Sequence, residues 1–154
     1  MKIKFKKLHK DSILPTPALP GDVGYDLMSI EDVTLAPGTV TKVRTGVCLA
    51  SYDPSIKLNV DESLTIYPEI KSRSGLASRG VIVVGGIIDT RYRGELIVLL
   101  LNTTNSNVII RRHDKCAQFV FTACLTNPSL VIEEDNVVEQ TERGASGFGS
   151  TDKD

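Results

Sequence analysis

The sequence has few cysteines, no excess of basic charge and no long apolar run, and each absence removes a class of protein. The three cysteines, Cys48, Cys116 and Cys124, lack paired spacing, so neither a disulfide framework nor a zinc site is indicated and we expect buried, reduced thiols. With 18 basic and 19 acidic residues the formal net charge is -1, which argues against a broad nucleic-acid-binding face. The longest apolar run, Ile97 to Leu101, is strand-sized, so no membrane span is expected.

The first ten residues contain lysines but no apolar core of the length found in signal peptides. We therefore expect an intracellular, cytoplasmic protein, with a nuclear location open if the source is eukaryotic or viral. A chain of 154 residues has the length of one domain with its own core.

No segment sustains the period-3.6 apolar stripe of a long helix; short β-branched runs alternate instead with turn-forming residues. Ile3 and Phe5 alternate with lysines, as in an edge strand with a charged outer face. Many short strands with frequent turns predict an all-β sandwich or jelly-roll-like barrel. The other predicted strands are Val40–Val47, Ile56–Val60, Leu64–Ile70, Val81–Val84, Glu95–Leu101, Val108–Ile110, Ala117–Leu125 and Leu130–Glu134.

Residues 141–154 differ in composition from residues 1–140. They consist mainly of Gly, Ser, Thr and charged residues, with Phe148 as the only large apolar side chain, and such a segment cannot bury enough surface to order itself. We therefore divide the chain into a β-barrel domain, 1–140, and a flexible C-terminal arm, 141–154. A frayed terminus is the simple interpretation. The combination of Arg143 with glycines, an aromatic ring and hydroxyl groups favours an arm that closes over a ligand.

Two carboxylates stand in glycine-bounded segments. Asp26 follows Gly24 and Tyr25, where an acid is most often a cap or a turn former. Asp89 lies between two glycine-bearing turns and close to Tyr92, which makes it a candidate general base. A purely structural turn aspartate is an equally common interpretation of Asp89.

Other segments suit an anionic ligand. Arg73, Ser74 and Gly75 combine a guanidinium, a hydroxyl and close backbone approach, although Ser-Arg-Ser-Gly also occurs in ordinary loops. Gln118 stands in an otherwise apolar strand and must find partners, which are either backbone groups or a ligand. The glycines of residues 144–149 do not link a strand to a helix, so a dinucleotide-binding fold is not indicated. A Gly-Lys-Ser/Thr P-loop is absent.

Taken in order, these segments, from Pro20 to Thr151, resemble the five motifs of the trimeric dUTPase family. The most specific are the third, Gly86 to Asp89 with Tyr92 and Gly94, and the fifth, Arg143-Gly144 with residues 147–151. The resemblance implies a jelly-roll-like subunit in a homotrimer, with active sites at the subunit interfaces. It also implies Mg²⁺-dependent hydrolysis of dUTP to dUMP and pyrophosphate, which limits uracil incorporation into DNA and supplies dUMP for thymidylate synthesis.

The resemblance also implies a role for individual residues. Asp26 would hold Mg²⁺ through water, and Asp89 would deprotonate the water that attacks the α-phosphorus. Tyr92 would lie beneath the deoxyribose and exclude a ribose 2′-hydroxyl, Arg143 would bind the γ-phosphate, and Phe148 would cover the uracil. The remaining substrate-binding residues that it implies are Arg73, Ser74, Gly75, Gly86, Ile87, Ile88, Gln118, Gly149, Ser150 and Thr151.

The sequence departs from the family pattern in several places. Arg91 replaces an acid or small residue two positions after the proposed base, where it can act electrostatically on Asp89, contact phosphate or point to solvent. His113 replaces a glycine and can alter its turn, and Asp152 brings negative charge to the arm. Residues 51–63 exceed the usual loop and predict an extended hairpin, either a surface for a protein partner or plain decoration.

Two other functions remain open from the sequence. A dCTP deaminase shares the fold, but that group lacks the Arg-Gly-x-x-Gly-Phe-Gly-Ser-Thr pattern of this arm. A regulatory protein that uses dUTP only as a switch is the second alternative. Intact Asp89, Tyr92 and Phe148 argue against a purely non-catalytic chain.

Overall fold

The computed structural model describes residues 3–52, 55–59 and 62–125. This part is almost entirely β-structure, as expected, with a single short helix. The elements are β1 (Lys4–Lys7), β2 (Thr16–Pro17), β3 (Tyr25–Met28), β4 (Val33–Leu35), β5 (Val40–Val43), β6 (Val47–Ser51), β7 (Ser55–Asn59), β8 (Glu62–Lys71), α1 (Ser74–Ala77), β9 (Val81–Val83), β10 (Val98–Asn102), β11 (Val108–Ile110) and β12 (Lys115–Leu125).

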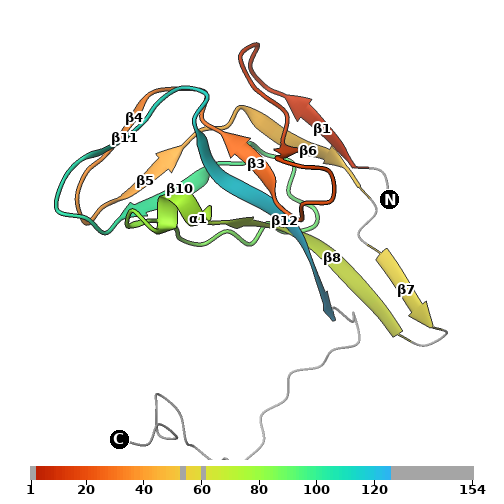
Figure 1. Ribbon diagram of the computed structural model, residues 1–154. Coiled ribbons are helices and arrows are strands. Elements are labelled where there is room, and N and C mark those ends of the chain that lie inside the picture. The colour runs from red at the N-terminus through yellow and green to blue at the C-terminus, as the bar shows by residue number, and fades with distance from the viewer. Residues whose placement is uncertain (1–2, 53–54, 60–61, 126–154) are drawn as a thin grey trace, which may run out of the picture.

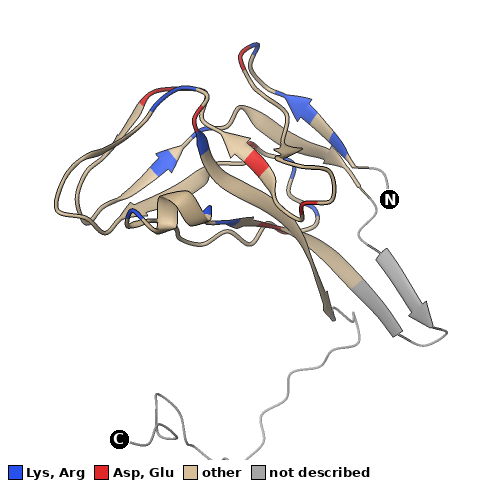
Figure 2. Cartoon of the chain, viewed as in Figure 1, with Lys and Arg blue, Asp and Glu red and all other residues tan. Residues whose placement is uncertain are grey.

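The strands form small antiparallel sheets around one core. The largest sheet has the order β2-β3-β12-β8-β7, and the others pair β1 with β6, β5 with β10 and β9, and β11 with β4. Figure 1 shows β12 crossing the middle of the subunit and the β7–β8 hairpin extending outward from it. The basic residues of β1 lie along an outer edge of the subunit (Figure 2).

The largest sheet has one apolar face and one polar face. Leu27 on β3, Ile70 on β8 and Phe119 on β12 are almost fully buried in the same core cluster. Side chains alternate between the two faces of a strand. The residues beside them, Asp26 and Gln118, therefore lie on the opposite face, and the same alternation that buries the core also presents these two polar groups.

The strand predictions hold in part. Residues 40–47 were expected to form one strand, and this is wrong: β5 and β6 are separated at Gly46, whose φ of 67° interrupts extended backbone. The edge strand near Phe5 is confirmed as β1, with exposed lysines. The extended hairpin is confirmed as β7–β8. The strand expected at Leu130–Glu134 lies outside the described residues, and β2, β3 and β4 were not predicted.

The cysteines are free, as expected. Cys48 and Cys116 are buried, whereas Cys124 is only half-buried. Within the described residues no helix has the length and apolar character needed to cross a membrane.

Candidate active site

Three polar side chains come together on the polar face of the largest sheet. Residues paired directly across antiparallel strands share a face, and Asp26 pairs with Gln118 while Met28 pairs with Lys115. Lys115 and Gln118 are three residues apart, so a regular strand would place them on opposite faces. The register shift that follows Lys115 inserts one extra residue, and this bulge turns both side chains toward Asp26.

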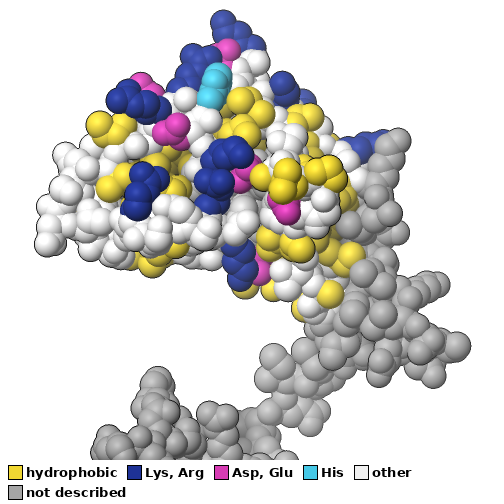
Figure 3. Space-filling view, viewed as in Figure 1, with side chains coloured by type: hydrophobic (Ala, Val, Ile, Leu, Met, Phe, Trp, Pro, Cys, Tyr) yellow, Lys and Arg dark blue, Asp and Glu magenta, His cyan; other side chains and the backbone are white. Residues whose placement is uncertain are grey.

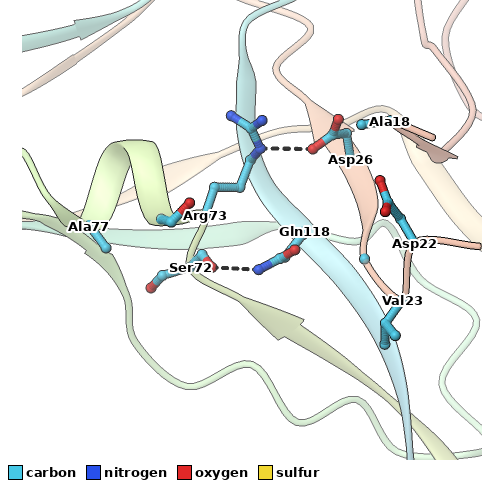
Figure 4. A pocket seen from close by; sticks show the side chains of 10 residues that line it. Ala18, Asp22, Val23, Asp26, Ser72, Arg73, Ala77 and Gln118 are labelled. Atoms are coloured by element: carbon cyan, nitrogen blue, oxygen red, sulfur yellow. Dashed lines mark hydrogen bonds and ion pairs between the residues drawn. The ribbon is translucent and has the colours of Figure 1, made fainter.

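Asp26 is the centre of this group. The residue is 6% exposed. Its Oδ1 lies 2.7 Å from Arg73 Nε, and its Oδ2 lies 2.7 Å from Lys115 Nζ. Among the described residues Oδ2 accepts no well-aligned hydrogen bond, so the Lys115 contact is an ion pair only. Because Arg73 uses Nε on Asp26, both of its terminal Nη groups remain for other oxygen atoms (Figure 4).

Arg73, Ser72, Ser74, Gln118 and Asp26 line a cavity of about 470 Å³. Gln118 donates from Nε2 to the Ser72 carbonyl at 2.8 Å, which fixes the amide plane (Figure 4). The backbone interpretation of this glutamine is therefore confirmed, and its side chain also lines the cavity. We call Asp26, Ser72, Arg73, Lys115 and Gln118 the Asp26 cluster.

The neighbouring residues complete this region. Arg73 is the N-cap residue of α1, and Ser74 begins that helix at the rim of the cavity. Gly75 has open space where a side chain would start. Figure 3 shows basic side chains gathered near the middle of this face, with acidic side chains beside them.

The Asp26 carboxylate fits a magnesium ion held through water. Its buried Oδ2 lacks a well-aligned donor, and carboxylate oxygen is the ligand type that Mg²⁺ prefers. No group of three or more His, Cys, Asp or Glu side chains that could hold a metal occurs in the described part of the chain. This donor set suits an ion whose other ligands are phosphate oxygens and water.

The second group of predicted residues lies in the segment 86–95, which we call the Asp89 hairpin. Its first part runs beside β8: Ile70 N donates to Gly86 O at 2.8 Å, and Ile88 N donates to Pro68 O at 3.0 Å. A side chain at Gly86 would begin 2.3 Å from the Ile70 carbonyl, and the φ of Gly86 is 109°. Only glycine permits this close approach.

This pairing leaves Ile87 free to recognise a ligand. Ile87 bridges Glu69 in the antiparallel pattern in which the flanking residues carry the hydrogen bonds. Its own N–H and carbonyl therefore point away from β8. Neither group takes part in a hydrogen bond within the described residues, and the side chain is 69% exposed. The hairpin thus offers a fixed backbone donor and a fixed acceptor.

Asp89 and Tyr92 lie at the tip of this hairpin. Asp89 is exposed, and its carboxylate accepts no hydrogen bond within the described residues. It lines two cavities, of about 690 Å³ and 180 Å³, and the smaller one also contains Tyr92. Tyr92 is 43% exposed and donates its hydroxyl to the Glu95 carbonyl at 3.0 Å.

The Asp26 cluster and the Asp89 hairpin are separate within one subunit. The cavity of the Asp26 cluster shares no lining residue with either cavity at Asp89. Ile88 lies opposite Pro68, and Arg73 follows Pro68 by five residues, an extended separation of about 17 Å. The predicted fifth-motif residues Arg143, Phe148, Gly149, Ser150 and Thr151, together with Asp152, lie outside the described residues.

Two departures have a structural outcome. His113 adopts a φ of 68°, so the turn keeps a backbone that glycine adopts freely and histidine adopts at a cost of about 1 kcal/mol. Its N–H donates to the Ser29 carbonyl at 2.7 Å. Arg91 is exposed and makes no hydrogen bond or ion pair within the described part of the chain, although it lines the larger cavity at Asp89.

Sequence reasoning missed residues that organise both regions. Lys115 was not selected, because its approach to Asp26 depends on a bulge that periodicity does not reveal. Glu95 was also missed, although it accepts from Gly46 N at 2.8 Å and pairs with Arg44 at 3.2 Å. An acid immediately after Gly94 was the available signal for Glu95.

Comparison with known proteins gives consistent matches. The dUTPase family model matches residues 10–152. The deoxyuridine 5'-triphosphate nucleotidohydrolase of Clostridioides difficile is 35% identical over 152 residues, which cover 97% of this chain and 96% of that protein. The match to a corresponding protein of Trichodesmium erythraeum is 38% identical over 154 residues, covering 98% of this chain and 99% of that protein.

The fold is also found in a solved structure. A variant of the Staphylococcus bacteriophage 80alpha dUTPase with dUpNHpp has a TM-score of 0.74 at 24% identity, and the match covers 97% of this chain and 98% of that one. At this identity the likeness concerns the fold alone.

Proposed function

Since the chain belongs to the dUTPase family and hydrolyses dUTP to dUMP and pyrophosphate in a Mg²⁺-dependent reaction, we propose that its active sites combine the Asp26 cluster of one subunit with the Asp89 hairpin of another. The family fold is a jelly-roll-like subunit of a homotrimer. The observation that carries the proposal is the separation of the two regions, which open on different cavities. When subunits join around a three-fold axis, each interface can bring together one Asp26 cluster and one Asp89 hairpin.

The Asp26 cluster binds the phosphates in this proposal. Arg73 offers its two Nη groups to phosphate oxygens, and its connection to Asp26 holds the guanidinium in place before the substrate arrives. Ser74 and Gly75 contribute hydroxyl and backbone donors at the start of α1, and Gln118 contacts phosphate from the cavity wall. Fixed donors of this kind stabilise charge that develops during phosphoryl transfer.

Asp26 would hold Mg²⁺ through water. When bound, the ion neutralises phosphate charge and makes pyrophosphate a better leaving group. The protein contributes two groups here. The buried Asp26 carboxylate would orient the hydrated ion, and Arg73 lies beside it.

Asp89 acts as the general base. It accepts a proton from water that attacks the α-phosphorus, and its exposure leaves room for that water in the assembled site. The N–H and carbonyl of Ile87 pair with the uracil edge, while Gly86 and Ile88 hold this segment in place through their hydrogen bonds to β8. The wrong base leaves the Ile87 groups unpaired. Tyr92 lies beneath the deoxyribose and leaves no room for a 2′-hydroxyl.

The C-terminal residues complete the site in the same proposal. Residues 141–154 form a flexible arm on the domain 1–140. Arg143 binds the γ-phosphate, Phe148 covers the uracil, and Gly149, Ser150 and Thr151 enclose the phosphates and exclude water. The protein acts in an intracellular, cytoplasmic compartment without binding nucleic acid directly, and the 51–63 hairpin is a candidate surface for a protein partner.

Replacing Asp89 by Asn tests the base assignment. Turnover of dUTP should fall about 10²- to 10⁴-fold. Affinity for a non-hydrolysable dUTP analogue and the melting temperature should stay near wild type, because the carboxylate makes no hydrogen bond in the described structure. Glu31→Gln, a matched change at an exposed acid, should leave the rate unchanged. An Asp89→Asn enzyme with wild-type turnover would refute the assignment.

A further inference from the structure

Arg93 contacts two backbone carbonyls of the Asp89 hairpin. Its Nη1 donates to the Thr90 carbonyl at 2.8 Å and to the Tyr92 carbonyl at 2.8 Å. These carbonyls flank Arg91 at the tip of the hairpin. A single guanidinium nitrogen therefore fixes the separation of two peptide groups directly after Asp89.

The same guanidinium reaches the aromatic core. Arg93 Cζ lies over the ring of Tyr52, 6.0 Å from its centroid. Tyr52 is buried, and its ring contacts Phe121 at 5.4 Å between centroids; Phe121 in turn contacts the fully buried Phe119 at 5.0 Å. Burial raises the pKa of the Tyr52 hydroxyl and the nearby Arg93 charge lowers it, which agrees with this placement.

The ring of Tyr92 is held by a second set of contacts, which do not involve Arg93. A side chain at Gly94 would begin 2.4 Å from the Tyr92 hydroxyl oxygen, so the ring lies directly over this glycine. The Tyr92 hydroxyl donates to the Glu95 carbonyl at 3.0 Å. The Glu95 carboxylate is anchored on Gly46 N at 2.8 Å. The hydroxyl end of the Tyr92 ring is therefore held at Glu95, and the Tyr92 backbone carbonyl is held by Arg93.

Arg91 provides the contrast. It stands two residues earlier in the same hairpin and lines the same larger cavity as Arg93. Its side chain makes no hydrogen bond or ion pair among the residues that the structure describes. The two arginines thus carry the same charge and line the same cavity as Asp89, but they differ in their contacts.

We propose that Arg93 is a positioning residue that clamps the tip of the Asp89 hairpin against the aromatic core, and that this clamp sets both the reach of Asp89 and the preference of Tyr92 for deoxyribose over ribose. The inference rests on the proposed function, which assigns the base to Asp89 and the sugar contact to Tyr92. Small displacements of positioned groups have large kinetic effects, because catalysis depends on aligned reacting atoms.

The test compares four full-length proteins in pyrophosphate release from dUTP and from UTP. Arg93→Ala should lower kcat/KM for dUTP about tenfold, mostly in kcat, and should narrow the preference for dUTP over UTP about tenfold. Arg93→Lys should restore most of the dUTP rate, because an ammonium can donate to both carbonyls. Arg91→Ala removes the same charge from the same cavity but no backbone contact, so it should leave the preference for dUTP over UTP at its wild-type value.

The ratio of the two rates separates positioning from folding. A fraction of unfolded Arg93→Ala protein lowers the dUTP and UTP rates equally and leaves their ratio unchanged, so a wild-type ratio would overturn the proposal. An equal loss of the preference for dUTP over UTP in Arg91→Ala and Arg93→Ala would also overturn the proposal, since the loss of one charge would then explain the effect. If Asp89→Asn keeps its turnover, the base assignment fails. If Arg93→Ala still narrows the ratio of the dUTP and UTP rates in that case, the positioning role of Arg93 remains supported.

Discussion

The Asp26 cluster and the Asp89 hairpin both present a carboxylate, but they hold it in opposite ways. Asp26 is buried between Arg73 and Lys115, each at 2.7 Å. Asp89 is exposed, and its side chain makes no hydrogen bond in the described part of the subunit. One carboxylate is already part of a completed network, whereas the other is supported only through the backbone around it.

The two carboxylates therefore differ in their support: the Asp26 side chain is held in place within one subunit, whereas the Asp89 side chain is not. A carboxylate held between two cations fixes their side chains, including the arginine that we propose to meet phosphate. An exposed carboxylate gains a defined environment only when another surface covers it. The structure of one subunit therefore contains a carboxylate network at Asp26 and an exposed carboxylate at Asp89, which agrees with the phosphate and base roles that we propose for them.

Removing the Asp26 charge should lower both the stability of the protein and its affinity for the substrate. Asp26→Asn leaves Arg73 and Lys115 without their shared partner. Because both cations reach solvent, we expect a loss of about 1–2 kcal/mol in the free energy of unfolding. Affinity for a dUTP analogue with Mg²⁺ should fall at least about tenfold.

Chemical denaturation and calorimetric titration measure these two quantities. Asp89→Asn is the matched carboxylate change and should leave the free energy of unfolding unaltered. Equal stability of the two variants would contradict the distinction between a networked and an unsupported carboxylate.

A smaller effect should follow from disturbing Gln118 through its neighbour. A Cβ at Gly24 would lie 2.2 Å from Gln118 Oε1, so Gly24→Ala should rotate the amide away from the Ser72 carbonyl. We expect KM for dUTP to rise about 3- to 10-fold with little change in kcat. Gln118→Ala should have a similar effect, and the double variant should show no further loss. Additive losses would show that Gly24 acts independently of Gln118.

Stability at alkaline pH should depend on Cys116. Burial raises the pKa of the Cys116 thiol to about 12, and the thiol donates to the Leu27 carbonyl at 3.3 Å. The unfolded thiol ionises at a lower pH, so this contribution to stability is complete below about pH 9 and is lost as pH rises toward 12.

The free energy of unfolding should therefore fall by about 1 kcal/mol per pH unit above pH 9. Cys116→Ala should show a shallower decline in the same titration. Parallel curves for the two proteins would contradict the assignment.

The sequence contained the fold class and most candidate residues, because both depend on local signals. Alternating apolar residues predicted the edge strand, and a segment longer than the usual family loop predicted the β7–β8 hairpin. Gly86, Asp89 and Tyr92 stand in one short segment, so their proximity followed from chain connectivity. Arg73 and Gln118 were selected for their chemistry, and the structure brings them together.

Features that depend on register were not predictable. Lys115 reaches Asp26 only because a bulge changes the face on which it lies. Arg91 was selected as a departure from the family pattern two positions after Asp89. Arg93 makes the contacts instead, because the direction of its side chain depends on the backbone of the turn. The division of the single predicted strand at residues 40–47 likewise depends on the conformation of Gly46.

Mixed trimers can show whether the Asp89 base and the Asp26 cluster of one active site come from different subunits. Arg73→Ala and Asp89→Asn proteins should each be nearly inactive alone. When they are unfolded together in equal amounts and refolded, random assembly should place an intact Arg73 cluster against an intact Asp89 hairpin in about a quarter of the sites. The account predicts recovery of about a quarter of the wild-type dUTP turnover. No recovery in trimers shown to be mixed would contradict it.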